Sequence, residues 1–355
     1  MPNLDSYQGI PLFYPEVAVL RALENQMGRR IPNKNRTPLQ FIDKQGLGFK
    51  AEHHHIIALN LSAQYLTTIP ETFTQFSKLQ SLNLAVNRLK VLPENFGHLI
   101  ELQTLRLDQN RHLTSLPDSF GQLSNLQTLY LQSNQLNTLP ESFGNLKNLT
   151  YLNLHTNQLN TLPESFGNLS RLQTLYLHEN QLSALPESFG QLKNLKEFLL
   201  WDNQLQSLPE SFGQLTNLRR LSLSANQLSS LPESFGNLTN LRKLNLEKNL
   251  FPPSPQKLFP LLRIGLKTSL YEILSVIQDI HRISPIILSF LIQEGKILSD
   301  FDFLRLFMLV KLEEVSPNQL KPFRPFLLAT LLAPSTSSDV RLKAKRALNL
   351  LGEKV

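Results

Sequence analysis

The feature that most constrains this chain is a leucine pattern that recurs nine times at nearly constant spacing. The pattern L-x-x-L-x-L-x-x-N-x-L begins at Ile56, Leu79, Leu102, Leu126, Leu149, Leu172, Leu195, Leu218 and Leu241. The spacing is 23 residues, except that the third copy has 24 because one residue is inserted between Asn110 and Leu113. Eight copies are complete, and the ninth stops at Asn249. One copy cannot bury its own apolar residues, whereas stacked copies share a continuous core, so we expect a solenoid.

Each copy has two halves with different expected structures. The Leu-x-Leu alternation of the first half predicts a strand, and the asparagine that follows it can bond buried backbone groups of the loop. Only the first copy departs from this, with Gln64 in place of asparagine. The second half, Leu-Pro-Glu-Ser-Phe-Gly-x-Leu, predicts a short helical return that starts at the proline. We expect the phenylalanines of these returns to stack as a spine: Phe73, Phe96, Phe120, Phe143, Phe166, Phe189, Phe212 and Phe235.

The repeated motif, L-P-x-x-F-x-x-L-x-x-L-x-x-L-x-L-x-x-N-x-L, resembles the 23-residue leucine-rich repeats of the intracellular Ras group and of bacterial and archaeal relatives. The resemblance covers residues 56–250. It implies an α/β solenoid, in which a horseshoe carries a parallel β-sheet on its concave face. Ras-group members scaffold signalling proteins, so the resemblance implies a Ras-like small GTPase as a candidate partner. It supplies no catalytic residues.

The two ends of the repeat region predict separate structures. Residues 1–55 are expected to form an N-terminal cap, since Val17, Leu20, Leu23 and Met27 have helical spacing and Gly28 follows as a stop. Residues 251–355 are expected to form an all-helical C-terminal domain of five or six helices. Serine–proline pairs there mark three helix starts, at Ser254, Ser284 and Ser316. The last helix resembles the second helix of a HEAT-type repeat in Asp339, Val340, Arg341, Ala344, Ala347 and Leu348.

Several classes of site are not expected. The chain has no cysteine, which excludes disulfides, thiol nucleophiles and cysteine-ligated metals. Residues 251–355 hold no glycine-rich phosphate loop, no H-E-x-x-H motif and one histidine, His281, so neither an enzyme nor a cofactor is predicted. Consecutive strand residues point to opposite faces, so the run from His53 to His55 predicts no metal site. Neither a signal peptide nor a membrane span is recognisable, so we expect a cytoplasmic protein. We also expect it to be a monomer.

The strand register places the only tryptophan, Trp201, outside the core. Positions 1, 4 and 6 of each copy point inward, whereas positions 3, 5, 7 and 8 face the concave side, and Trp201 occupies position 7. Adjacent strands lie about 4.8 Å apart, so aromatic residues of four neighbouring copies should form one patch. With Leu199, its members are Tyr130, Tyr151, His155, Tyr176, His178 and Trp201. Asp202 follows the patch, and beyond it the face turns basic at Arg219, Arg220, Arg242 and Lys243.

These residues predict a surface that binds a protein partner on the concave face, with no small-molecule substrate. His155 and His178 are expected to contact the partner rather than to bind a metal. Two alternatives remain open. The aromatic side chains can simply pack on one another, with the basic flank against the C-terminal domain. Alternatively, residues 251–355, which carry a net charge of +5 where the repeats carry none, bind nucleic acid or an anionic surface.

Overall fold

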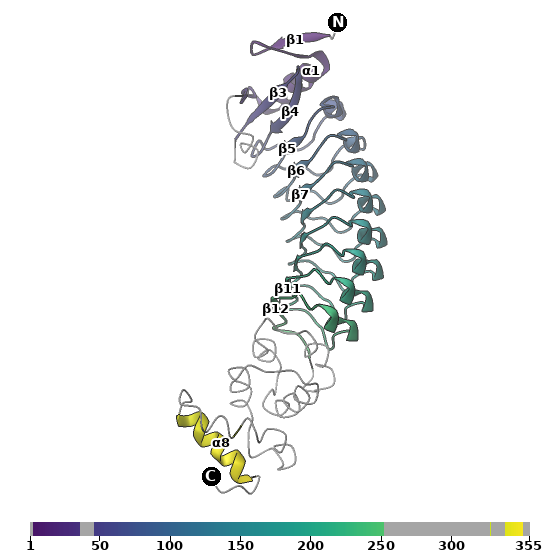
Figure 1. Cartoon of the computed structure of the whole chain (residues 1–355). Helices are drawn as coiled ribbons and strands as arrows, with labels where there is room; N and C mark the ends of the chain where they lie inside the picture. The colour runs from purple at the N-terminus through teal and green to yellow at the C-terminus, as the bar shows by residue number, and fades with distance from the viewer. Residues whose placement is uncertain (1–2, 36–45, 252–326, 328–337, 351–355) are drawn as a thin grey trace.

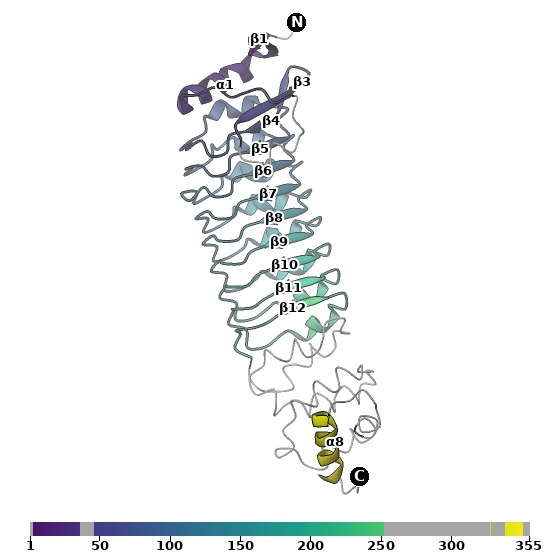
Figure 2. The ribbon, with the colours of Figure 1, turned by 90° about the vertical axis from the view of Figure 1, so that its left-hand side faces the viewer.

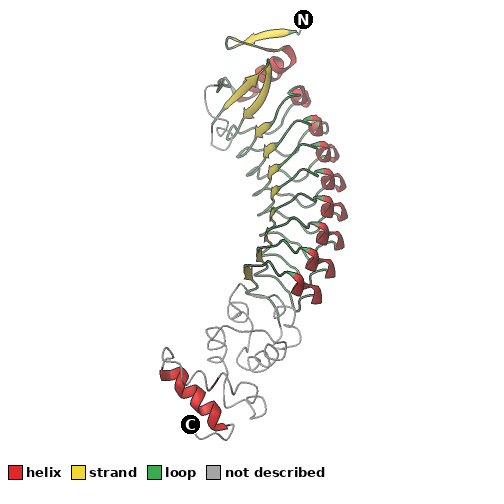
Figure 3. Ribbon diagram, viewed as in Figure 1, coloured by secondary structure: helices red, strands yellow, loops and turns green. Residues whose placement is uncertain are grey.

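The computed structural model describes residues 3–35, 46–251, 327 and 338–350. Over the repeats the chain coils into a curved solenoid (Figure 1). The strands line its concave side, and short helices line its convex side (Figures 1 and 3). The expected leucine-rich-repeat horseshoe is therefore present.

The concave face is one sheet of ten strands (Figure 2). In chain order the strands are β3 (Gly48–Glu52), β4 (His55–Asn60), β5 (Ser81–Asn83), β6 (Thr104–Arg106), β7 (Thr128–Tyr130), β8 (Tyr151–Asn153), β9 (Thr174–Tyr176), β10 (Glu197–Leu199), β11 (Arg220–Ser222) and β12 (Lys243–Asn245). From β4 to β12 all neighbours are parallel, and equivalent repeat positions lie side by side, as Leu152 does with Leu175. The extra residue of the third copy lies after β6 and leaves the register unchanged, since Thr104 pairs with Thr128. The predicted strands and their register are confirmed.

Each return is a 3₁₀ helix rather than an α-helix. These helices are η2 (Glu71–Gln75), η3 (Phe96–His98), η4 (Asp118–Gln122), η5 (Glu141–Asn145), η6 (Glu164–Asn168), η7 (Glu187–Gln191), η8 (Glu210–Gln214) and η9 (Glu233–Asn237). Except at η3, the proline stands just before the helix with an extended backbone. The carbonyl of Pro140, for example, accepts the amide hydrogen of Phe143 at 2.9 Å. Proline thus caps the turn without needing the amide hydrogen that it lacks.

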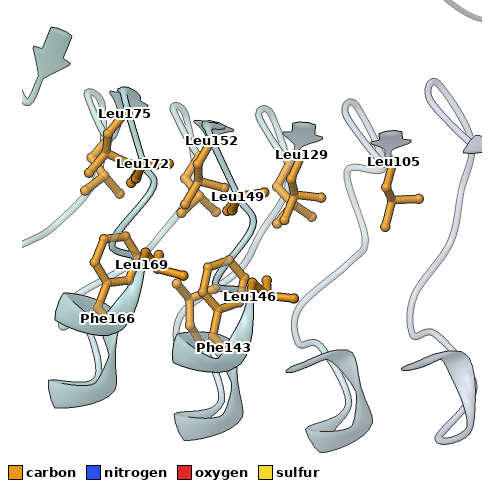
Figure 4. Close-up of a cluster of buried hydrophobic side chains, with 14 of the residues drawn as sticks. Leu105, Leu129, Phe143, Leu146, Leu149, Leu152, Phe166, Leu169, Leu172 and Leu175 are labelled. Carbon is orange, nitrogen blue, oxygen red and sulfur yellow. The ribbon is translucent and has the colours of Figure 1, made fainter. Parts of the chain in front are cut away.

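The core is a stack of leucine and phenylalanine layers between sheet and returns (Figure 4). The phenylalanine rings from Phe96 to Phe235 stack nearly parallel, and Phe143 and Phe166, for example, lie 6.1 Å apart between centroids. The predicted spine is confirmed over this stretch. Phe73 instead meets Phe76 edge-on, with centroids 5.0 Å apart.

Close contact between the returns accounts for the repeated glycine after phenylalanine. A Cβ atom built on Gly144 would overlap the carbonyl oxygen of Ser165 in the next copy. Any larger side chain there would push two repeats apart, which the tightly packed core resists. The first copy has Thr74 at the equivalent position.

The asparagines form a ladder inside the loops, as predicted. Asn157 is buried, and its amide nitrogen donates to the carbonyls of Leu131 and Leu154, each at 3.0 Å. Its amide oxygen accepts the backbone N–H of Leu136 at 3.0 Å. One side chain therefore satisfies three backbone groups and joins two adjacent copies.

The N-terminal region adds a hairpin, a helix and one antiparallel strand. Strands β1 (Leu4–Tyr7) and β2 (Ile10–Phe13) pair antiparallel and lead into helix α1 (Tyr14–Met27), which ends at the left-handed Gly28 as predicted. Val17, Leu20 and Leu23 of this helix are buried in the same hydrophobic cluster as the first repeat. Strand β3 pairs antiparallel with β4, the first repeat strand. The assignment of residues 1–55 as a separate cap stays a prediction.

Strand β3 and the β1–β2 hairpin were not predicted, and for β3 the turn that leads into β4 shows why. His53 and His54 occupy this two-residue turn with φ of 48° and 70°. Such turns normally carry asparagine or glycine, so two histidines give no turn signal. The Nδ1 atom of His55 lies 3.0 Å from a carboxylate oxygen of the buried Glu16.

Of the C-terminal region, the described residues include helix α8 (Ser338–Leu350), which confirms the last predicted helix. Ala344, Ala347 and Leu348 are buried on it. The other predicted helices lie outside the described residues, and the HEAT-type resemblance stays a prediction. None of the helices described is long and apolar enough to cross a membrane.

Candidate functional site

Three tyrosines form a ladder across strands β7 to β9. The rings of Tyr130 and Tyr151 lie 5.0 Å apart between centroids, and those of Tyr151 and Tyr176 lie 5.8 Å apart, edge to face. All three are half-buried. The hydroxyl of Tyr176 donates to a carboxylate oxygen of Glu197 at 3.3 Å. Leu199 continues the ladder, because it pairs with Tyr176 in the neighbouring strand.

A second column runs beside the ladder and ends at the tryptophan. His155 and His178 stack with centroids 4.5 Å apart and planes 11° apart, and His178 stacks on Trp201 at 4.4 Å and 18°. Tyr176 links the two columns, with its ring 6.1 Å from that of His178. Trp201 is half-buried, which agrees with the prediction that it lies outside the core. We call these six rings (Tyr130, Tyr151, His155, Tyr176, His178 and Trp201), with Leu199, the aromatic face.

Hydrogen bonding fixes one end of the histidine column. The hydroxyl of Thr156 donates to Glu179 at 2.9 Å and lies 2.7 Å from Nδ1 of His155. A hydroxyl has only one hydrogen, so His155 must donate from Nδ1 to this oxygen. That leaves Nε2 of His155 as a hydrogen-bond acceptor.

The histidine column is uncharged at neutral pH. Burial, reinforced by the neighbouring His155, lowers the pKa of His178 to about 4, although Glu179 acts in the opposite direction. Burial also lowers the pKa of His155. The buried Nδ1 of His178 has no hydrogen-bond partner among the described residues. The stack is therefore a neutral aromatic surface rather than a charged one.

Tyr151 and Tyr176 likewise keep their hydroxyl protons. Burial, followed by the charges of the adjacent tyrosines, raises the pKa of Tyr151 to about 12. Burial and the nearby Glu197 raise the pKa of Tyr176. The tyrosine ladder thus offers hydroxyl groups that can both donate and accept hydrogen bonds.

An arginine borders the aromatic face toward the N-terminus. The guanidinium of Arg106 lies 4.8 Å from the centroid of Tyr130 and forms an ion pair with Asp108 at 3.2 Å. The sequence-based prediction of the site did not include this pair. The signal was available, because Arg106 shares a register column with Tyr130 and Asp108 shares one with His155.

The residues of the predicted basic flank lie in different environments. Arg220 pairs with Glu197 at 2.9 Å, and it lines a hollow of about 350 Å³ together with Arg242 and Lys243. Arg219 is exposed but is not among the residues that line this hollow. Asp202 is exposed beside Trp201 in a left-handed loop position with φ of 57°. The structure thus brings together the aromatic face and most of its predicted flank.

The expected absence of a metal and the alternative basic surface both stay predictions. No group of three or more histidine and acidic side chains is suitably placed for a metal within them. The alternative of nucleic-acid or anionic-surface binding through residues 251–355 falls mostly outside the described residues.

The fold and this surface define a class: a repeat solenoid that presents a preformed sheet face. The sequence matches protein-family models that narrow this class to one family. A model described as leucine-rich repeat region matches residues 141–316, and one described as leucine rich repeat matches residues 54–111 and 100–159. The chain belongs to the leucine-rich-repeat proteins. The first match runs beyond residue 250, where the strict 23-residue pattern ends.

Solved structures point to the same family. A leucine-rich-repeat protein of Leptospira interrogans is 35% identical over 58% of each chain, with a TM-score of 0.53. A chain in the structure of the Toll–Spätzle complex from Drosophila is 29% identical, with a TM-score of 0.53. That match covers 67% of this chain and 31% of the Drosophila chain. This chain therefore spans less than two thirds of either neighbour. No curated protein matches it.

Proposed function

We propose that this protein is a non-enzymatic scaffold that binds a protein partner across its concave sheet, with the aromatic face at the centre of the interface. The observation that carries the proposal is the continuous stack from His155 through His178 to Trp201 beside the tyrosine ladder. Tryptophan and tyrosine dominate the binding energy of protein interfaces because they bury large areas at small entropic cost.

The stacking that holds these rings together also favours binding. Side chains that must be ordered on binding reduce affinity, by about 0.5–1.5 kcal/mol each. Here every ring of the aromatic face already contacts another, and the sheet fixes the strands that carry them. The packing of the rings on one another therefore serves as preorganisation as well as structure.

Charges around the aromatic face suit a polypeptide partner. Arg106 and Asp108 lie at one border, and Glu197, Arg220 and Arg242 lie at the other. A polar rim of mixed charge around an apolar centre is typical of protein interfaces. By the resemblance to Ras-group repeats, a Ras-like small GTPase is the first candidate to test. We also propose that the protein is monomeric and cytoplasmic.

The repeats themselves provide substitutions that preserve the fold. Trp201→Ser introduces the residue found at Ser224 in the same column, and Tyr176→Asn introduces the residue found at Asn153. The matched control removes apolar surface elsewhere, with Val91→Thr and Ile100→Ser. Both control residues are exposed; the fourth copy carries Thr138 in place of Val91, and the third copy carries Ser124 in place of Ile100.

The experiment is affinity capture from lysate, after which the captured protein is purified and titrated against each form of the full chain. Emission from Trp201, the only tryptophan, reports contact with the face when the partner contributes none. We expect the double variant to weaken binding at least 100-fold, since each such contact is worth about 2 kcal/mol or more. The control should bind within about twofold of the wild type. Equal affinity of the aromatic-face variant and the wild type would refute the proposal.

A further inference from the structure

A second hollow lies away from the aromatic face, in the loops that follow strands β4, β5 and β6. Its volume is about 270 Å³. The residues that line it are Tyr65, Val86, Asn87, Arg88, Gln109, Arg111 and His112. Most of them follow the strands at repeat positions 8 to 10, so the hollow belongs to the asparagine-loop edge of the solenoid.

The first three copies depart from the others at this edge. Position 10 is glutamine in five later copies, at Gln135, Gln158, Gln181, Gln204 and Gln227. The first three copies carry Tyr65, Arg88 and Arg111 instead, and the inserted residue of the third copy is His112. An otherwise regular chain thus concentrates an aromatic ring and three basic side chains in one place.

The core does not account for these residues, because their side chains are exposed. The backbone N–H of Arg88 donates to the carbonyl of Leu66 at 2.8 Å, and that of Gln158 donates to the carbonyl of Leu136 at 2.9 Å. Arg88 therefore makes the same main-chain bond as the glutamine of a later copy.

The hollow is positively charged and only partly organised by its own contacts. Tyr65 is 71% exposed, and the guanidinium of Arg88 lies 4.9 Å from its ring centroid. This contact holds the guanidinium while leaving its N–H groups available to a ligand. Within the described part of the chain, neither Arg88 nor Arg111 forms an ion pair, and no acidic side chain lines the hollow.

We propose that this hollow binds an acidic segment of a polypeptide, independently of the aromatic face. Carboxylates of the segment pair with Arg88 and Arg111, which suit the planar geometry of a carboxylate, and an apolar neighbour lies on the ring of Tyr65.

Size and charge favour this ligand over two others. Small-molecule pockets usually enclose about 300–1,000 Å³ and bury most of the ligand, whereas this hollow is smaller and open. Nucleic-acid sites present an extended basic stripe, whereas residues 56–250 carry no net charge. Two arginines beside one tyrosine match a short acidic stretch instead.

The test uses a fluorescein-labelled peptide, Glu-Glu-Tyr-Glu-Glu, titrated against the full chain at low salt and followed by fluorescence anisotropy. The main variant is Arg88→Gln with Arg111→Gln, which installs the glutamine of the later copies. Its control is Lys147→Gln with Lys193→Gln, which removes the same charge at two exposed residues outside both surfaces. We expect the main variant to weaken binding about tenfold, Tyr65→Gln about threefold and the control less than twofold.

Further arms distinguish this hollow from the aromatic face and from a nucleic-acid site. The aromatic-face variant, Trp201→Ser with Tyr176→Asn, should bind the peptide as the wild type does, so this proposal and the proposed function can fail separately. A peptide with glutamine in place of each glutamate should not bind. The proposal is overturned if the wild type does not bind the acidic peptide at about 1 mM, or if both charge variants weaken binding equally. Tighter binding of a single-stranded oligonucleotide of equal charge would also overturn it, in favour of a nucleic-acid site.

Discussion

Protonation of His178 should destabilise the folded protein in a defined pH range. In the fold, the pKa of His178 is held at about 4, whereas the pKa of a histidine in an unfolded chain is near 6.5. The unfolded state therefore binds more protons between these two values. The contribution to the free energy of unfolding is complete above pH 6.5 and is lost as the pH falls toward 4.

The size of the effect follows from the pKa shift and the position of the ring. A shift from 6.5 to about 4 corresponds to roughly 3 kcal/mol if each unit counts fully. His178 is only half-buried, however, so solvent screening reduces the expected loss to about 1–2 kcal/mol. Two neighbours oppose one another: His155 lowers the pKa of His178, and Glu179 raises it.

The assay compares urea unfolding of the wild type and His178→Gln at pH 7 and pH 4.5, with emission from Trp201 as one readout and circular dichroism as the second. Glutamine is the residue found at Gln132 in the same column, so the variant should fold. Other groups titrate in both proteins and cancel in the difference. We expect the wild type to lose about 1–2 kcal/mol more than the variant. If both proteins lose the same amount, His178 is not the group that the fold keeps neutral, and the argument is wrong.

Two further predictions concern the solenoid itself. Asn157→Ala should lower the free energy of unfolding by about 3–5 kcal/mol, because two carbonyls and one amide lose their partner in a buried loop. Urea unfolding measures this loss, and a value below about 1 kcal/mol would contradict the prediction. Gly144→Ala should cost about 2–4 kcal/mol, because the added methyl group would overlap the next repeat. Thermal melting measures that loss, and an unchanged melting temperature would show that neighbouring returns can separate freely.

The sequence predicted the solenoid well because its repeat length is nearly constant. A fixed spacing of 23 residues places every strand residue in a column, which is why the spacing alone puts Leu199 beside Tyr176. The hairpin at β1–β2 and the antiparallel strand β3 were missed because their turns lie outside the repeat. The His53–His54 turn carries none of the residues that usually signal one.

The site was predicted less completely, for a different reason. Spacing states which column a side chain occupies, but not whether it points into solvent or lies flat on its neighbour. The stacking of His178 on Trp201 and the ring contact of Arg106 depend on those rotamers. The hollow at Tyr65 was missed because its residues belong to the loop column at position 10 and not to a column of the sheet, although that position departs from glutamine in the first three copies.

The constant register of the sheet also sets a fixed distance between the aromatic face and the hollow at Tyr65. Trp201 lies four copies beyond Arg111, and at about 4.8 Å per strand this separates them by roughly 19 Å along the solenoid. An extended chain covers about 3.3–3.6 Å per residue, so a segment that touches both places needs at least about six residues between its contacts. Removing one whole repeat between them would shorten that distance by a single fixed step. The affinities of partner segments of different lengths would then show which separation between the two sites a partner spans.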